Sequence, residues 1–277
     1  MNIQSRARAH GGEQIVASHR SQACGGEMTF AIYLPPQAQN GPVPVLWYLS
    51  GLTCTHQNVM DKGEYRAAAA EHGVAIVCPD TSPRGDAPDI EDDWQIGHGA
   101  GFYVDATEEP WSAHYRMERY VMDELPALVG ETFPVDMKRQ SVTGHSMGGH
   151  GALTLALRHP DRFRSVSAFA PIVAPMQAEW SRKAFATYLG PDEAAWADHD
   201  AVALIDAGAR VVDILVDQGE ADGFLQDGLK PWLLRDACDA AGIPLTLNMR
   251  PGYDHSYFFI STFMADHIGW HRERLAA

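Results

Sequence analysis

The sequence has few basic residues. Its 277 residues include 21 Lys and Arg against 36 Asp and Glu, which gives a formal net charge of −15 at pH 7. Nucleic acids and anionic membranes bind proteins mainly through basic patches. The charge therefore argues against both as the main partner, but it leaves open a small anionic substrate, which responds to local charge.

Cysteines are also few, and long apolar runs are absent. The four cysteines, Cys24, Cys54, Cys78 and Cys238, form no Cys-x-x-Cys pair and match no zinc-module spacing. They are interpreted as free thiols in a reducing compartment. No stretch of 18 apolar residues occurs, and the first thirty residues contain no apolar run typical of a signal peptide. We therefore expect a cytoplasmic protein.

Hydrophobic residues are plentiful enough for a large core, at 45% of the chain. Short apolar runs such as Val43–Leu49, which are typical of strands buried on both faces, alternate with helical patterns. This order predicts one α/β domain over residues 1–277, with a mostly parallel sheet of about eight strands and helices on both faces. The expected strands are 14–18, 28–34, 43–49, 74–78, 140–143, 165–170, 211–216 and 245–249, and the main expected helices are 64–72, 114–132, 150–158, 226–241 and 258–275.

Two segments interrupt the alternation. Residues 80–112 show little periodicity and are rich in Gly and Pro, and residues 171–208 hold only short helical patches. A long loop without secondary structure is unusual unless it builds a site. We therefore expect both segments to shape an active-site cleft. The acidic run Asp89–Asp93 is interpreted as a solvated loop rather than a metal site.

The pentapeptide Gly144-His145-Ser146-Met147-Gly148 is the strongest chemical signal. It matches G-x-S-x-G and lies between an expected strand and an expected helix. In α/β-hydrolases this strand–turn–helix arrangement exposes the serine hydroxyl above the sheet, and the helix start supplies N–H groups and a positive dipole end. A chance match in a glycine-rich turn is the alternative, but the context favours Ser146 as a nucleophile.

A serine hydroxyl needs a base, and the base needs an acid that orients it. In this fold the acid follows the serine in the chain and the histidine comes last. His255 lies between the expected strand 245–249 and the last helix, at the correct edge of the sheet, so we predict that it is the base. His150 and His159 lie in or at the end of the helix that follows the serine, and His267 and His271, an i, i+4 pair on the last helix, are interpreted as surface or packing residues.

The orienting acid should follow the expected strand 211–216. The candidates are Asp217, Glu220 and Asp222. Asp217 begins the loop directly after the strand, whereas Asp222 lies further out beside Gly223, where a carboxylate can reach the histidine. Position favours Asp222 and leaves the other two open.

The developing oxyanion needs two backbone N–H donors. Met147, which follows the nucleophile, is one, and Leu52 in the loop after strand 43–49 is the best candidate for the other. Cys54, Trp180 and His145 are candidates for the wall of the substrate pocket. No third ligand is spaced with His145 and His150 for zinc, so we expect neither a metal nor a cofactor.

Several longer stretches are more specific than the pentapeptide, and through them the chain resembles the esterase D family of α/β-hydrolases, the S-formylglutathione hydrolases. These stretches run in order along nearly the whole chain: SGLTCT (50–55), PDTSPRG (79–85), GAGFYVDAT (99–107), PWSAHYR (110–116), GHSMGGHG (144–151), SAFAPI (167–172), KAFATYLG (183–190), DQGEADGFL (217–225) and GYDHSYFFI (252–260).

The resemblance implies an α/β-hydrolase fold and a triad of Ser146, Asp222 and His255. It also implies Leu52 and Met147 as oxyanion donors, hydrolysis of S-formylglutathione in formaldehyde detoxification, and a homodimer. Three alternatives stay open: a carboxylesterase for short acyl esters, an acyltransferase, and a binding protein without catalysis. The last would usually lack a triad residue, and this chain has all three.

Overall fold

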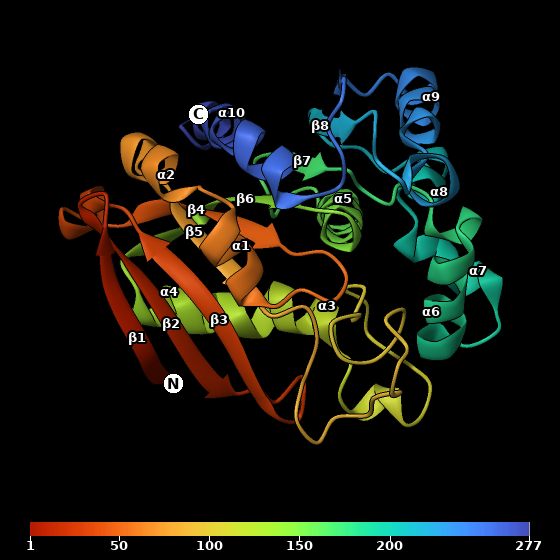
Figure 1. The fold of residues 1–277 in the computed structure, drawn as a ribbon, viewed down its shortest axis with the longest axis horizontal. Helices are drawn as coiled ribbons and strands as arrows, with labels where there is room; N and C mark the ends of the chain where they lie inside the picture. The colour runs from red at the N-terminus through yellow and green to blue at the C-terminus, as the bar shows by residue number, and fades with distance from the viewer. Residues whose placement is uncertain (277) are drawn as a thin grey trace.

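One nine-stranded sheet forms the centre of the computed structural model, which describes residues 1–276 (Figure 1). The strand order is β1-β2-β3-β5-β4-β6-β7-β8-β9. The pairs from β5 through β4 to β9 are parallel, and β1, β2 and β3 add an antiparallel flank. The strands are β1 Asn2–Ala9, β2 Gly12–Arg20, β3 Glu27–Leu34, β4 Val43–Leu49, β5 Ala75–Pro79, β6 Val135–Gly144, β7 Val166–Phe169, β8 Ile214–Gly219 and β9 Leu245–Arg250.

The predicted class, a mostly parallel α/β sheet, is confirmed, but the sheet has nine strands instead of about eight. The additional strand is β1, which lies at the edge of the sheet and is mostly exposed. Its sequence, NIQSRARA, has no apolar alternation. It pairs with β2 through its backbone, which leaves no signal in the side-chain pattern.

Helices cover both faces of the sheet. On one face α1 (His56–Lys62), α2 (Arg66–His72) and α10 (Tyr257–Leu275) pack together. On the other face α5 (Met147–Arg158) packs under β6 and β7 and contacts α8 (Ala201–Asp206), which contacts α9 (Pro231–Ala241). The remaining helices include α3 (Met117–Arg119), α4 (Leu125–Thr132), α6 (Glu179–Leu189) and α7 (Glu193–Trp196). Within residues 1–276 no helix is both long and apolar enough to cross a membrane.

Several predicted elements differ in the structure. The strand predicted at 140–143 begins earlier, as β6 at Val135, and the helix predicted at 114–132 comprises α3, a π-helix and α4. The strand predicted at 211–216 is β8 at Ile214–Gly219, so Asp217 lies within the strand and not in the loop after it. Val212 is 81% exposed, which shows that apolar residues alone did not set the strand boundary. The helix predicted at 226–241 is divided into a π-helix at Leu225–Leu229 and α9 from Pro231. The break lies at Lys230, which adopts a left-handed conformation with φ 49°, since a residue before a proline disfavours the helical region.

The carboxyl ends of the parallel strands bring distant segments together. Leu49 at the end of β4 pairs with Gly144 at the end of β6, so the loop 50–55 lies beside the turn that holds Ser146. The segments after β8 and β9 carry Asp222 and His255 to the same edge. In open α/β sheets, ligands bind outside these carboxyl ends.

Candidate active site

Ser146 occupies a strained turn between β6 and α5. Its φ of 58° and ψ of −117° are unusual for a residue with a side chain. The turn is so tight that a Cβ at position 148 would lie 1.9 Å from the Leu49 carbonyl oxygen, which explains the glycine there. The Ser146 N–H donates to the Phe169 carbonyl at 2.9 Å. This bond stabilises the turn and keeps the serine at the carboxyl edge of the sheet.

Asp222 and His255 form a hydrogen bond of 2.6 Å between Oδ2 and Nδ1. The carboxylate is buried and has two further donors, the Phe224 N–H at 2.8 Å and the Gln218 side-chain amide at 3.1 Å. Asp222 is therefore held in one orientation. An N–H on Nδ1 of His255 leaves Nε2 as the nitrogen that can accept a proton.

Asp217, the other acid considered, lies elsewhere. Its buried carboxylate accepts hydrogen bonds from Arg250 at 2.9 Å and from Asn248 at 2.7 Å, both in β9. Burial would raise the pKa of Asp217, but the contact with His267, and then the bonds from Asn248 and Arg250, lower it. Glu220, the third candidate, is exposed. Of the three acids, only Asp222 has a hydrogen bond to His255 within residues 1–276.

Four other histidines follow Ser146 in or beside α5 and α10, and three of them are buried. His150, His267 and His271 are buried in the core, and His159 is partly exposed beside Glu118. The His271 ring nitrogens lie 2.7 Å from Ser165 Oγ and 2.8 Å from Ser167 Oγ. His271 therefore packs α10 against β7, whereas His150, on α5, packs against Phe102 and Phe185.

Ser146, His145 and His255 line a single pocket of about 240 Å³. Among residues 1–276 no hydrogen bond joins Ser146 to His255, and catalytic hydrogen bonds of this kind are often long before substrate binds. The remaining lining residues are Gly51, Leu52, Thr53, Trp94, Trp180 and Phe224. Trp94 comes from the segment 80–112 and Trp180 from the segment 171–208.

Aromatic rings form a continuous wall on one side of this pocket. The centroids of Phe224 and His255 are 5.0 Å apart, those of Trp180 and Phe224 6.4 Å, and those of Trp94 and Trp180 5.9 Å. The sequence pointed to Trp180 but not to Trp94 or Phe224. Phe224 lies two residues after Asp222, so its position beside the acid was the one signal that could have identified it.

His145 packs against His255, with ring centroids 4.4 Å apart and an angle of 44° between the ring planes. Burial, and then the neighbouring His255, lower the pKa of His145 well below the ordinary value of 6.5. His145 is therefore uncharged at neutral pH. It presents a neutral ring to His255 and to the pocket.

The loop after β4 lies against the turn at Ser146. A Cβ at position 51 would lie 3.1 Å from Ser146 Cβ, so this approach requires a small residue. The loop is fixed by hydrogen bonds from the Tyr103 hydroxyl to the Ser50 carbonyl and from the Thr53 N–H to the Gly99 carbonyl. Within residues 1–276 the N–H groups of Leu52 and Met147 have no hydrogen-bond acceptor, so both can serve as donors to a ligand.

Cys54 differs from its predicted place, because it is not among the residues that line this pocket. The chain turns back after Leu52, where the Cys54 N–H donates to the Gly51 carbonyl at 3.3 Å. The thiol lies beside Tyr257 at the start of α10, and burial raises the pKa of Cys54. Its side chain therefore lies behind the loop rather than in the pocket.

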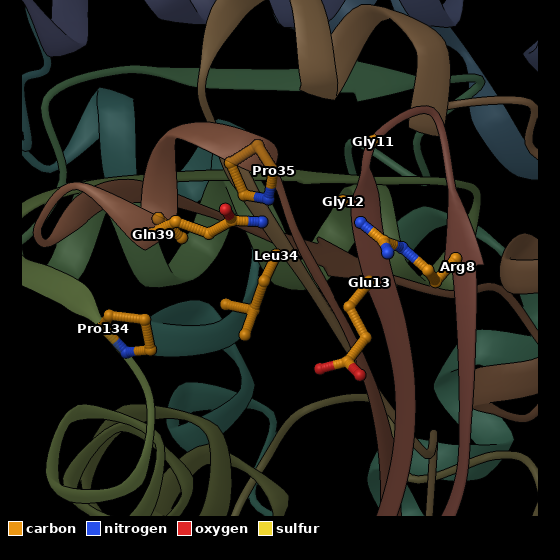
Figure 2. Close-up of a pocket in the computed structure, with 9 residues that line it drawn as sticks. Arg8, Gly11, Gly12, Glu13, Leu34, Pro35, Gln39 and Pro134 are labelled. Carbon is orange, nitrogen blue, oxygen red and sulfur yellow. The ribbon is translucent and has the colours of Figure 1, made fainter.

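A second hollow, of about 320 Å³, lies beside the β1–β2 hairpin (Figure 2). Its charged lining residues are Arg8 and Glu13, and its other walls include Leu34 and Pro134. It contains no serine, cysteine or histidine, so it offers no nucleophile or base. In residues 1–276 no group of three or more His, Cys, Asp or Glu is placed to hold a metal ion.

Known proteins resemble this chain in sequence over nearly its whole length. The model of the Esterase family, described as "Putative esterase", matches residues 21–273. S-formylglutathione hydrolase of Paracoccus denitrificans is 56% identical over 271 residues, which are 98% of this chain and 97% of that protein. S-formylglutathione hydrolase of Mus musculus is 53% identical over 276 residues, which are 99% and 98% of the two chains.

Solved structures agree with these sequences. An S-formylglutathione hydrolase from Agrobacterium tumefaciens superposes with a TM-score of 0.98 at 61% identity, covering 99% of this chain and 100% of that one. A serine hydrolase of Staphylococcus aureus, at 20% identity and a TM-score of 0.76, shares the fold. Identity above 50% over almost every residue, together with this superposition, means that the chain belongs to the S-formylglutathione hydrolase family of α/β-hydrolases.

Proposed function

We propose that the protein is a serine thioesterase that hydrolyses S-formylglutathione to formate and glutathione. The observation that carries the proposal is the Asp222–His255 hydrogen bond of 2.6 Å beside Ser146 in one pocket. Relatives named S-formylglutathione hydrolase, 50–56% identical over nearly the full length, support this substrate.

In the first half of the reaction Ser146 Oγ attacks the formyl carbon of the thioester, and His255 Nε2 takes the hydroxyl proton. The resulting imidazolium is stabilised by Asp222, which accepts its Nδ1–H. The C–S bond then breaks, the thiolate takes the proton from Nε2, and glutathione leaves. The formyl group remains as an ester of Ser146.

In the second half a water molecule gives a proton to His255 Nε2 and attacks the formyl ester. The C–O bond to Ser146 breaks, Oγ takes the proton back, and formic acid leaves and gives its proton to water to become formate. Both tetrahedral intermediates place negative charge on the former carbonyl oxygen. The N–H groups of Leu52 and Met147 are the proposed donors to that oxygen, and they have no acceptor within residues 1–276.

The pocket also suits short acyl esters with a neutral leaving group. Its walls are mainly apolar, and its volume of about 240 Å³ is below the roughly 300–1,000 Å³ that hold a drug-sized ligand. The match to the Esterase family supports this second activity. We expect both activities to use the same serine.

Steady-state kinetics on two substrates test the proposal. The wild-type protein and Ser146→Ala are compared for release of formate from S-formylglutathione and for hydrolysis of 4-nitrophenyl acetate. A higher kcat/KM for S-formylglutathione, lost in Ser146→Ala, supports the thioesterase. A protein that hydrolyses the aryl ester but releases no formate would be a general esterase instead.

A cytoplasmic homodimer is the proposed setting for this activity. The described chain has four free cysteines, three of them buried, which suits a compartment that keeps glutathione reduced. The dimer rests on the family resemblance alone. Cell fractionation tests the location, and light scattering at two protein concentrations tests the dimer.

A further inference from the structure

The Ser146 pocket is too small to enclose a tripeptide in addition to a formyl group. It has about 240 Å³, and its side walls are the rings of Trp94, Trp180 and Phe224. Trp94 and Phe224 are 45% and 44% exposed, so they lie at the mouth. If S-formylglutathione is the substrate, its peptide part must therefore lie over this aromatic rim, outside the pocket.

The charges near the rim are mostly negative. Glutathione carries two carboxylates and one ammonium group at neutral pH, so its carboxylates need a cation nearby. Within three positions in sequence of the lining residues, Lys and Arg occur only as Arg182 and Lys183, whereas the acids there include Glu91, Asp92, Glu179, Asp227 and Asp254. Lys230 also comes near Trp180, but its ammonium donates to the Gln177 carbonyl at 2.7 Å. An anionic peptide therefore has few places to dock.

Arg182 is already occupied. Its two terminal nitrogens lie 3.2 Å and 2.5 Å from the two carboxylate oxygens of Glu193, and one of them also donates to the Met176 carbonyl. A guanidinium paired on both nitrogens in this way has little capacity for another anion.

Lys183 lies one turn after Trp180 on α6, on the same side of the helix. Its Nζ lies 2.5 Å from Asp93 Oδ2, and Asp93 precedes Trp94 in the chain. The ion pair therefore lies next to the Trp94–Trp180 ring contact. It links α6 to the segment 80–112. Figure 1 shows both parts on the same side of the molecule.

The ammonium of Lys183 can donate further hydrogen bonds. Its side chain is 49% exposed, and Asp93 is its one hydrogen-bond partner within residues 1–276, so two of its three N–H donors face no protein acceptor. Asp93 is held by the Gln95 N–H at 3.1 Å, which keeps the carboxylate and thereby the ammonium in place. Lys183 is a fixed cation at the aromatic rim.

We propose that Lys183 binds a carboxylate of the glutathione moiety and so selects glutathione thioesters over neutral ones. This inference rests on the proposed function. The contact is made to a part of the substrate that does not react, so it is equally strong in the ground state and the transition state. Its loss should therefore raise KM and leave kcat little changed.

The test compares two thioesters that form the same formyl-enzyme, S-formylglutathione and the neutral S-formyl-2-mercaptoethanol. For Lys183→Met we expect the ratio of their kcat/KM values to fall about fivefold, as for one exposed charge pair. Asp93→Asn breaks the same ion pair but keeps the ammonium and removes the carboxylate that competes for it, so the ratio should not fall. Lys138→Met, at the amino end of β6, controls for the lost charge and should retain the wild-type ratio.

A second measurement does not depend on turnover of S-formylglutathione. Glutathione is used as an inhibitor of 4-nitrophenyl acetate hydrolysis, and its inhibition constant should rise about fivefold in Lys183→Met. An unchanged ratio and inhibition constant would overturn the proposal. An equal loss on both thioesters, shared by Asp93→Asn, would also overturn it, because Lys183 would then only anchor the segment 80–112. A wild-type protein that releases no formate from S-formylglutathione refutes the proposed function, and the inhibition constants still decide the role of Lys183.

Discussion

Asp222 Oδ2 lies 2.6 Å from Nδ1 of His255, whereas Asp217, earlier on the same stretch of chain, pairs with Arg250. The two aspartates are both buried, but their partners differ. Asp222 holds an imidazole at the pocket, and Asp217 joins two neighbouring strands. This difference separates an effect on catalysis from an effect on stability.

Asp222→Asn should reduce kcat by about 10³–10⁴ with a small change in Tm, because an asparagine does not hold the imidazole in the required tautomer. Asp217→Asn should lower the free energy of unfolding by about 3 kcal/mol, because Arg250 loses the buried carboxylate with which it pairs. Kinetics and denaturant unfolding of both variants measure the two effects. The opposite pattern would identify Asp217 as the catalytic acid.

Ser146→Ala should reduce kcat by about 10³ or more, since the members of a triad act as a unit. The variant should also fail to react with a fluorophosphonate probe. Circular dichroism checks that it is folded. Near-normal turnover in a folded Ser146→Ala protein would mean that another residue is the nucleophile.

The stability of the fold should fall as the pH drops below about 6.5, the ordinary histidine value. Burial lowers the pKa of His150 to about 3 and that of His271 well below 6.5. Both are therefore neutral in the folded protein, while the unfolded chain binds their protons. At pH values between its pKa in the unfolded chain and its pKa in the folded protein, each histidine lowers the free energy of unfolding by about 1.4 kcal/mol for every unit by which the pH falls.

Denaturant unfolding at several pH values between 7.5 and 5 measures this slope. His150→Gln keeps a side-chain donor for the Phe102 carbonyl but has no titrating group. The free energy of unfolding of this variant should therefore change less with pH, because one fewer proton is bound when the chain unfolds. An equal slope in the variant and the wild type would show that His150 binds a proton in the folded state.

N-ethylmaleimide should inactivate the protein through Cys54, and Cys54→Ser should be active and resistant. A bulky group on this thiol would displace the adjacent Leu52 loop, and about 1 Å of misplacement can cost ~10² in rate. Because burial raises the pKa of Cys54, the thiolate is scarce at pH 7 and inactivation should accelerate as the pH rises.

Inactivation rates at pH 7 and at higher pH check both points. Cys24, Cys78 and Cys238 are buried, so they serve as internal controls for slow reaction. If Cys54→Ser loses activity as fast as the wild type, the reactive thiol is another cysteine.

The sequence by itself predicted the parts of this protein that local patterns encode. The apolar run Val43–Leu49 is β4 with the same boundaries, and Gly73 ends α2 in a left-handed conformation with φ 67°. The turn at Ser146 follows from a glycine-flanked junction of strand and helix. The same reasoning pointed to Asp222 and His255, which the fold brings within hydrogen-bond distance, and their catalytic roles stay predictions.

Only the tertiary structure decided which side chains form the pocket and its rim. Trp94 and Phe224 are 130 residues apart in the chain, and the contact of each with Trp180 leaves no periodic signal in the sequence. The same holds for the Asp93–Lys183 ion pair and for the position of Cys54 behind its loop. Such contacts depend on how strands and loops distant in sequence pack at one edge of the sheet, and composition and spacing do not specify that packing.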